Sequence, residues 1–222
     1  MTGMPTGAEP SGAEVPGADM ADVEVSDAEL VVLLDSGGRA VGSTAKASVH
    51  HGDTPLHLAF SCYVVDGQGR VLVTRRALGK TTFPGLWTNS LCGHPMPGES
   101  IVKAVLRRAD EELGLRLAPR QVDLVLPEFG YWAQMDGVVE HEMCPVLLAQ
   151  VDGESRLCPD ADEVEDTAWM PWQKFVDAVL GGKPGWSPWC REQVQQLQAL
   201  GPDPTRWPDA DADRLPPAAR LS

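Results

Sequence analysis

The sequence predicts an α+β fold in which a mixed β-sheet core is flanked by helices. Short apolar runs bounded by turn residues fill much of the chain between residues 30 and 151, and such runs are typical of strands. One long helical pattern stands among them at 99–113, and two more follow at 171–179 and 190–199. Because strands and helices do not alternate regularly along the chain, the pattern favours the α+β class.

The composition indicates one domain with a tail at each end. Of the 222 residues, 43% are hydrophobic, which is enough for a sizeable core. Residues 1–27 are rich in Gly, Ala, Pro and acidic residues and contain no aromatic, so we expect a disordered acidic tail there. The domain is expected over 28–200. Residues 201–222, rich in Pro, Asp, Ala and Arg, are expected to form a loose C-terminal tail.

The formal net charge of −14 argues against nucleic acid or an anionic membrane surface as a partner. No Lys or Arg precedes Arg39, so much of the negative charge lies in the N-terminal tail, and a basic pocket for an anionic substrate remains compatible with it. Five scattered cysteines do not form a disulfide framework, which favours a reducing compartment. With no signal-peptide pattern and no apolar run long enough to span a bilayer, we expect a soluble, cytoplasmic protein.

The strand patterns begin directly after the N-terminal tail and are separated by turns and loops. The predicted strands are 30–34, 39–45, 56–65, 71–75, 122–126, 129–134 and 138–151. The predicted turns and loops are a turn at 35–38, a polar loop at 46–55, a hairpin turn at 66–69, a basic connection at 76–80, an aromatic loop at 81–87 and an acidic loop at 160–166. We expect the acidic loop to be exposed to solvent.

The helix at 99–113 carries the most specific pattern in the chain. Glu99 is expected to open it, where the helix dipole favours a carboxylate. Arg108 and Glu112 are four residues apart and share one face, and Gly114 is expected to end the helix. This arrangement presents carboxylates where a divalent cation can bridge to the oxygens of a diphosphate.

Three histidines and two glutamates form a candidate metal site. His57, Glu140 and Glu142 fall on predicted strands, and the two glutamates alternate, so their side chains point to the same face. His50 lies in the polar loop, and His94 precedes the central helix. Imidazole together with carboxylate suits Mn²⁺ or Zn²⁺ more than Mg²⁺ alone. From spacing alone, the alternative is that the histidines are surface or hydrogen-bonding residues.

Three further groups suit chemistry on an anionic substrate with an apolar tail. Cys92 lies in a Cys-Gly-His turn, where nearby cations would lower the pKa of its thiol and make it a base or nucleophile, unless it is a buried inert cysteine. A basic set suggests a diphosphate clamp, and an aromatic set suggests a wall for a carbocation, although ordinary surface charge and core packing are the alternatives. The basic set is Lys46, Arg75, Arg76, Lys80 and Arg108, and the aromatic set is Phe83, Trp87, Tyr131, Trp186 and Trp189. Because Arg75 and Arg76 are adjacent on a strand, only one of them should face the site.

Several separate motifs agree on one family. They are LHLAFSCYVV, TRRALGKTTFPGLWTNSLCGHP, FGYWA, VEHEMCPV and SPW, together with the box formed by Gly93, Glu99, Arg107, Glu111, Glu112 and Gly114. Over about residues 30–198 the chain resembles the type 1 isopentenyl-diphosphate isomerases, enzymes of isoprenoid synthesis with the Nudix fold. The box departs from the pattern of Nudix hydrolases, since Arg108 stands where these carry a glutamate after the arginine. This departure fits an isomerase.

The resemblance implies a role for each of these groups. The ligands of an Mn²⁺ or Zn²⁺ site would be His50, His57, His94, Glu140 and Glu142, with His51 as a rival to His50. A second ion, Mg²⁺, would bind with the substrate diphosphate at Glu112 and Cys92, and the diphosphate would bind Lys46, Arg76, Lys80 and Arg108. The catalytic residues would be Cys92 and Glu142, with Tyr131 beside the glutamate and Trp189 facing the cationic centre. No flavin is implied.

The implied reaction interconverts isopentenyl diphosphate and dimethylallyl diphosphate through a tertiary carbocation, with this small molecule as the only partner of a monomer. Two other classes compete with it. A Nudix hydrolase acting on a nucleoside diphosphate linked to another group would have no need of Cys92. A catalytically inactive Nudix-fold binding module would have lost candidate ligands, whereas all five are present here.

Overall fold

The computed structural model describes residues 29–152 and 156–220, so the predicted tail at 1–27 lies outside the described residues. The strands of the described chain are β1 (Leu30–Leu34), β2 (Ala40–Ala45), β3 (His57–Leu58), β4 (Phe60–Asp66), β5 (Arg70–Arg76), β6 (Trp87–Thr88), β7 (Leu91–Gly93), β8 (Val122–Leu126), β9 (Gly130–Met135), β10 (Val138–Met143), β11 (Val146–Val151) and β12 (Val164–Pro171). The α-helices are α1 (Lys46–Val49), α2 (Ile101–Leu113), α3 (Trp172–Leu180) and α4 (Pro188–Leu197), and short 3₁₀ turns are η1 (Pro119–Gln121), η2 (Gln198–Leu200), η3 (Pro204–Arg206), η4 (Ala212–Arg214) and η5 (Pro217–Ala219).

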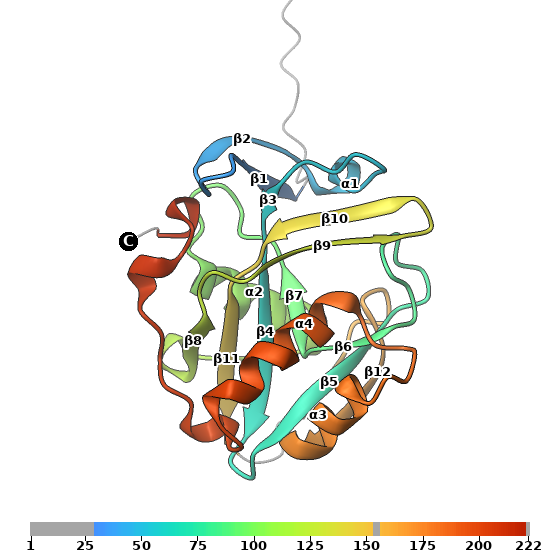
Figure 1. Cartoon of the computed structure of the whole chain (residues 1–222), viewed down its shortest axis with the longest axis vertical. Helices are drawn as coiled ribbons and strands as arrows, with labels where there is room; N and C mark the ends of the chain where they lie inside the picture. Colours follow the sequence, from blue (N-terminus) through green and yellow to red (C-terminus); the bar gives the residue numbers. More distant parts are fainter. Residues whose placement is uncertain (1–28, 153–155, 221–222) are drawn as a thin grey trace, which may run out of the picture.

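The strands form two sheets, and the one that contains β1, β2, β9 and β10 lies above the one that contains β4, β5 and β11 in the view of Figure 1. One sheet has the order β2-β1-β3-β10-β9, and the other has the order β12-β5-β4-β11-β8, with β6 paired to β5 and β7 paired to β4. The pairs β10/β3 and β11/β4 are parallel, and the other pairs are antiparallel. The α+β class and the mixed sheet predicted from the sequence are confirmed.

Two predicted long strands are each divided between the two sheets. The run 138–151 breaks after Met143, so β10 belongs to the first sheet and β11 to the second. Pro145 lies at this break and has no N–H to donate to a ladder, which explains why the pairing stops there. The run 56–65 breaks at the same level, at Ala59, whose N–H donates to the carbonyl of Met143 at 2.9 Å. In the first sheet, β3 and β10 pair in parallel, and this pairing places His57 directly opposite Glu142.

Strand β4 is buried on both faces, and its alternating side chains contribute to two separate cores. Phe60, Cys62 and Val64 belong to the cluster that also contains the apolar face of α2. Tyr63 and Val65 belong to the other cluster, with side chains from α3 and α4. The helices therefore cover opposite faces of the same sheet. None of the helices within 29–152 and 156–220 is long and apolar enough to cross a membrane.

Helix α2 begins two residues later than the sequence predicts. Ser100 is its N-cap, and the Ser100 side chain accepts a hydrogen bond from the N–H of Lys103 at 3.4 Å. Glu99 lies just before the helix and binds Arg107, with 2.9 Å between Glu99 Oε2 and Arg107 Nη2. Gly114 ends the helix in the left-handed conformation, with φ of 63°.

Strand β12 was not predicted, because its first residues belong to an acidic run that was expected to be a solvated loop. The strand pairs antiparallel with β5 at the edge of the second sheet. An edge strand keeps one row of backbone groups and several side chains exposed, so Glu165 and Asp166 remain in contact with solvent. The acidic residues at 160–166 therefore gave no sign of the strand that begins at Val164.

The segment after Gly201 was expected to be a loose tail, and up to residue 220 it is instead packed against the domain. It forms the 3₁₀ turns η3, η4 and η5, and the side chains of Trp207, Leu215 and Ala219 are buried. The indole of Trp207 meets that of Trp172 edge to face, with 4.8 Å between ring centroids, and donates a hydrogen bond to the carbonyl of Gly201 at 3.0 Å. Hydrogen bonds to the domain, such as the one from the N–H of Leu124 to Oδ1 of Asp209 at 2.9 Å, add to this apolar packing.

We therefore expect Trp207→Ala to lower the free energy of unfolding by about 3 kcal/mol or more, the usual cost of deleting a large buried aromatic side chain. Thermal unfolding followed by circular dichroism measures this effect. Trp132→Ala is the matched control, because the side chain of Trp132 is 57% exposed. Equal melting temperatures for the two variants would contradict the packing of the C-terminal segment.

Candidate active site

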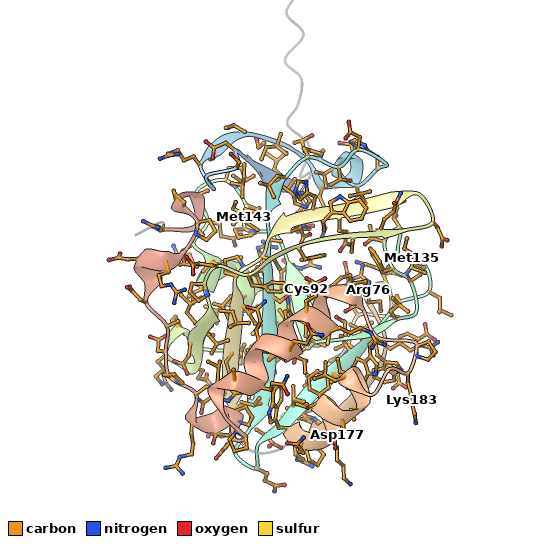
Figure 2. The ribbon with its side chains drawn as sticks, in the orientation of Figure 1. Arg76, Cys92, Met135, Met143, Asp177 and Lys183 are labelled. Atoms are coloured by element: carbon orange, nitrogen blue, oxygen red, sulfur yellow. The ribbon has the colours of Figure 1, made fainter. Side chains whose placement is uncertain are left out.

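A single cavity of about 460 Å³ collects nearly all of the predicted site residues. Its walls come from both sheets and from α1, α2 and α4, and Arg76 and Cys92, both labelled in Figure 2, contribute to them. The predicted residues in the wall are Lys46, His50, Arg76, Lys80, Cys92, His94, Arg108, Glu112, Tyr131, Glu140, Glu142 and Trp189. Among the residues to which the resemblance implies a role, the remaining one is His57, which does not line the cavity and is fully buried. The other candidates, Arg75, Phe83, Trp87 and Trp186, do not line the cavity.

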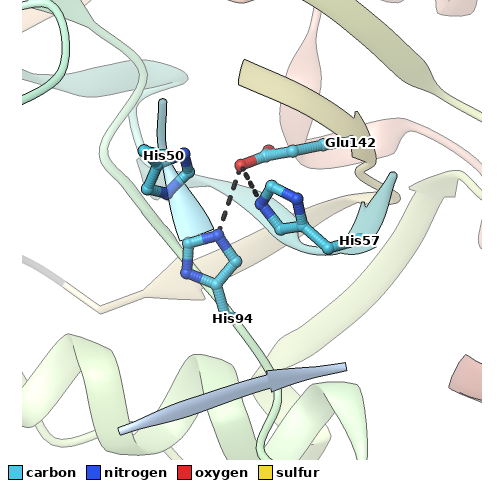
Figure 3. Close-up of side chains that lie close together, drawn as sticks. All are labelled: His50, His57, His94 and Glu142. Carbon is cyan, nitrogen blue, oxygen red and sulfur yellow. Dashed lines mark hydrogen bonds and ion pairs between the residues drawn. The ribbon is translucent and has the colours of Figure 1, made fainter. Parts of the chain in front are cut away.

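Three histidines and one glutamate converge at one end of this cavity (Figure 3). One potential ligand atom from each of His50, His57, His94 and Glu142 lies within 4.8 Å of the others. Glu142 Oε1 is 3.2 Å from Nε2 of His94 and 3.4 Å from Nε2 of His57. The rival residue, His51, is exposed and accepts a hydrogen bond from the N–H of Asp53, so the structure places His50 in the cluster.

This cluster fits a divalent cation. The Nδ1 of His57 donates to the carbonyl of Pro55 at 2.9 Å, so in the neutral ring Nε2 presents its lone pair to the carboxylate of Glu142. Two acceptors facing each other in a buried site require a positive charge between them. In addition, Nδ1 of His50 and Nδ1 of His94 are buried, and within the described part of the chain neither has a hydrogen-bond partner.

The pKa values of His50, His94 and Glu142 also favour metal binding. Burial lowers the pKa of His50 to about 4 and also lowers the pKa of His94, so both rings are neutral near pH 7 and can offer lone pairs. Burial acts in the same direction on His57, but its contact with Glu142 outweighs burial and leaves its pKa raised. Burial would raise the pKa of Glu142, yet the two imidazoles hold it well below its usual range. The carboxylate is therefore ionised.

Glu140 lies in the same cavity but outside the cluster. Its Oε2 accepts a short hydrogen bond of 2.6 Å from the hydroxyl of Tyr131. Burial and the neighbouring charge of Glu142 raise the pKa of Glu140. Tyr131 is the cross-strand partner of Glu142 in the sheet, so it is adjacent to the glutamate as expected, but its hydroxyl binds the other carboxylate. Metal ligation by Glu140 remains a prediction.

The thiol of Cys92, on β7, is held between a polar side chain of β4 and one of the turn that joins β6 to β7. Its Sγ lies 3.3 Å from the hydroxyl of Ser61 and 3.3 Å from Oδ1 of Asn89. Burial raises the pKa of Cys92 to about 12 and outweighs the lowering by Arg76. The expected lowering of the thiol pKa by nearby cations is therefore wrong for the charges of the chain itself. Asn89, which was not predicted as a site residue, is fully buried.

Trp189 forms the aromatic part of the wall and is almost completely buried. Its indole N–H donates to Oδ1 of Asn89 at 3.1 Å, and the guanidinium carbon of Arg76 lies 5.4 Å from its ring centroid. Phe83 and Tyr131 pack against it, with 5.2 and 5.5 Å between ring centroids. Oδ1 of Asn89 accepts hydrogen bonds from both Trp189 and the Cys92 thiol, so Asn89 fixes the position of the indole relative to the sulfur.

Three of the four predicted diphosphate-binding cations are paired with carboxylates that also line the cavity. Lys46 Nζ is 2.8 Å from Glu29, and Lys80 Nζ binds Glu163. Glu163 also lies 3.2 Å from Arg108 Nη2. Glu29 and Glu163 line the cavity but were not predicted as site residues, and Glu163 was wrongly expected in a solvated loop. Sequence spacing holds no signal for them, since their lysine partners are 17 and 83 residues away.

Glu112 and Arg108 form a buried pair on the cavity side of α2. Arg108 Nη2 lies 2.6 Å from the Glu112 carboxylate, as the i,i+4 spacing predicts. Arg76 lines the cavity, whereas Arg75 does not and donates to the carbonyl of Gly85 at 3.0 Å. The expectation that only one of these two arginines faces the site is confirmed.

Comparisons with known proteins agree with this site. The NUDIX domain family matches residues 55–190. The isopentenyl-diphosphate Delta-isomerase of Saccharopolyspora erythraea is 54% identical over 195 residues, which cover 87% of this chain and 98% of that protein. The enzyme of the same name from Mycolicibacterium vanbaalenii is 54% identical over 176 residues, covering 78% of this chain and 93% of that protein.

A solved structure supports the fold independently. The crystal structure of DR0079 from Deinococcus radiodurans superposes with a TM-score of 0.58 at 16% identity, covering 76% of this chain and 98% of that one. At this identity the likeness concerns the fold alone. The alignments with the two curated relatives cover most of this chain and most of each relative. The NUDIX match covers more than half of this chain. The chain is therefore a NUDIX-domain protein that belongs to the isopentenyl-diphosphate Delta-isomerase family.

Proposed function

We propose that this chain interconverts isopentenyl diphosphate and dimethylallyl diphosphate by adding a proton to one carbon and removing a proton from another. The observation that carries the proposal is the presence of a thiol, Cys92, and a histidine-bound carboxylate, Glu142, in the wall of one buried cavity. The names of the relatives, which share about half of their residues with this chain, support the same substrate.

The cationic side chains in the cavity wall are suited to binding the diphosphate. Lys46, Arg76, Lys80 and Arg108 would bind its oxygens, and three of these cations would exchange a carboxylate partner for the substrate. The cluster of His50, His57, His94 and Glu142, joined by Glu140, would hold Mn²⁺ or Zn²⁺, and Glu112 with Cys92 would hold Mg²⁺ together with the diphosphate. Bound divalent ions would neutralise diphosphate charge and strengthen a coordinated acid. No flavin is needed, because the reaction moves protons without net oxidation.

Each of the two proton transfers is assigned to a different residue, one to Glu142 and the other to Cys92. Glu142, with Tyr131 nearby, takes up a proton from solvent and gives it to C4 of the alkene: the O–H bond breaks, the electron pair of the double bond forms the new C4–H bond, and a tertiary cation is left at C3. A divalent ion held at Cys92 would favour its thiolate over the thiol. The Cys92 thiolate then takes a proton from C2; the S–H bond forms, the C–H bond breaks, and its electron pair forms the new C2=C3 double bond. Trp189 stabilises the cation by about 2 kcal/mol, or roughly thirtyfold in rate. The buried walls keep water from capturing it.

One chain supplies the whole site. Every predicted metal-binding, diphosphate-binding and catalytic residue comes from the same protomer, so we propose that a monomer is sufficient. The net charge of −14 disfavours nucleic acid as a partner.

Proton NMR of isopentenyl diphosphate incubated with the protein, Mg²⁺ and Mn²⁺ tests the proposal. We expect the terminal methylene signals to be replaced by two methyl signals of dimethylallyl diphosphate. Unchanged substrate, together with release of phosphate or a nucleotide from nucleoside diphosphate compounds in a parallel tube, would instead place the chain among hydrolases.

Removal of divalent ions is expected to abolish this conversion. After chelation only a proton can lie between His57 and the Glu142 carboxylate, and the diphosphate meets only the cationic side chains of the protein. Metal content by elemental analysis and turnover are measured together before chelation, after chelation, and after Mn²⁺ and Mg²⁺ are returned. Full turnover by metal-free protein would contradict the assigned site.

A further inference from the structure

A buried hydroxyl lies directly behind the thiol of Cys92. Ser61 is the cross-strand partner of Cys92, and its Oγ is 3.3 Å from Sγ. The side chain of Ser61 is fully buried and does not line the cavity, so it cannot touch a substrate there. Its effect on chemistry must therefore act through the sulfur.

The proton of this hydroxyl is directed by a chain of hydrogen bonds that starts at Tyr63. The hydroxyl of Tyr63 donates to Oε1 of Gln193 at 2.8 Å, and Nε2 of Gln193 donates to Ser61 Oγ at 2.8 Å. Within the described chain, the other acceptor near the Tyr63 hydroxyl is the sulfur of Cys190, at 3.8 Å, which favours this orientation of the amide. Ser61 accepts from Gln193, so its own proton must point toward a sulfur.

On its other side, Cys92 meets an atom that can only accept. Asn89 uses its Nδ2 to donate to the carbonyls of Leu91 and Cys62, at 2.7 and 3.1 Å. Its Oδ1 accepts from the indole N–H of Trp189, which has no lone pair to offer, and this fixes the amide orientation. The S–H of Cys92 therefore points to Asn89, which leaves the Cys92 sulfur able to accept the O–H of Ser61.

We propose that Ser61, oriented by Gln193, is a positioning residue that donates a hydrogen bond to the Cys92 sulfur and holds it toward the substrate during proton transfer. This inference rests on the proposed function. Cys144 is the other sulfur near Ser61, at 3.4 Å, but it is buried and does not line the cavity. A hydroxyl binds a charged sulfur more strongly than a neutral one, so the bond to Cys92 is the one that strengthens when the sulfur gives up its proton. Ser61 keeps its own proton throughout.

Steady-state kinetics of the metal-loaded variants tests this role. We expect Ser61→Ala to lower kcat by about 10- to 100-fold, the effect of losing one hydrogen bond to a charged group, with little change in KM because Ser61 does not reach the substrate. Ser61→Thr keeps the hydroxyl and should restore most of kcat. Gln193→Met keeps the side-chain volume but removes the donor that orients Ser61, and it should lower kcat in the same direction.

Ser90→Ala is the matched control, because Ser90 is also a fully buried serine but bonds only backbone groups, Val64 N–H and Leu72 carbonyl. It should reduce the melting temperature and leave kcat near that of the wild type. A kcat in Ser61→Ala and Gln193→Met near that of the wild type, or equal losses in Ser61→Ala and Ser90→Ala, would overturn the inference while the active wild type upholds the proposed function. If Ser61→Ala does not fold, Gln193→Met and Ser61→Thr decide by the same criteria. An inactive wild type would instead refute the proposed function itself.

Discussion

Cys92→Ala is expected to lower kcat for isomerisation by about a thousandfold or more, because the site loses the base on one face of the substrate. Cys92 lines the cavity, and no other cysteine of the described chain does. The change removes one sulfur atom from a half-buried position, so the fold and the histidine cluster should be retained. Turnover is measured by NMR, metal content by elemental analysis, and folding by circular dichroism.

Cys158→Ala is the control for this experiment, since Cys158 is exposed and outside the cavity, and its turnover should match the wild type. Turnover of Cys92→Ala within a few-fold of the wild type would show that another group removes the C2 proton. Loss of metal together with loss of turnover would show that the thiol acts mainly in holding the site together.

Glu142→Gln is expected to remove activity and metal together. The carboxylate lies 3.2 Å from His94 and 3.4 Å from His57, and it is the only carboxylate of the cluster within the described chain. The amide keeps the shape but carries no charge and no acidic proton, so we expect kcat to fall by about a thousandfold or more. Metal affinity should fall by about tenfold or more, since one anionic ligand is lost.

Glu165→Gln provides the comparison, because Glu165 is exposed on β12 and outside the cavity. It should leave both quantities unchanged. Retained turnover in metal-depleted Glu142→Gln would contradict the dual role of this carboxylate, and retained metal with lost turnover would restrict Glu142 to the proton transfer.

The sequence predicts an element well where its apolar pattern is clear or a glycine marks its end. Val122–Leu126 matches its predicted strand at both ends, and the helix over 101–113 ends at the glycine that the pattern marks. The division of 138–151 between two sheets could not be predicted from apolar residues alone, because the mixed first half (VVEHEM) and the nearly continuous apolar second half (VLLAQV) are both compatible with a strand. Only Pro145 hints at the break, and a proline also fits an edge strand.

The candidate site was predicted from a family resemblance rather than from spacing. The structure adds the hydrogen-bond partners and the burial of the site residues, which neither the resemblance nor the spacing indicates. Hydrogen-bond partners depend on which side chains meet in space, so the Tyr131 hydroxyl binding Glu140 had no signal in the sequence. The same holds for Glu163, which belongs to an acidic run and still lines the cavity. A thiol beside cations was expected to be acidic, but burial has the larger effect on the pKa of Cys92.

The position of deuterium in the product formed in D₂O tests the central claim most directly. Two separate proton transfers, one on the Glu142 side and one at Cys92, predict dimethylallyl diphosphate with solvent deuterium in the methyl group derived from C4, and deuterium at C2 of the isopentenyl diphosphate that reforms. Product that contains only protium in that methyl group would mean that hydrogen moves directly from C2 to C4, and it would contradict a mechanism that uses two protein groups.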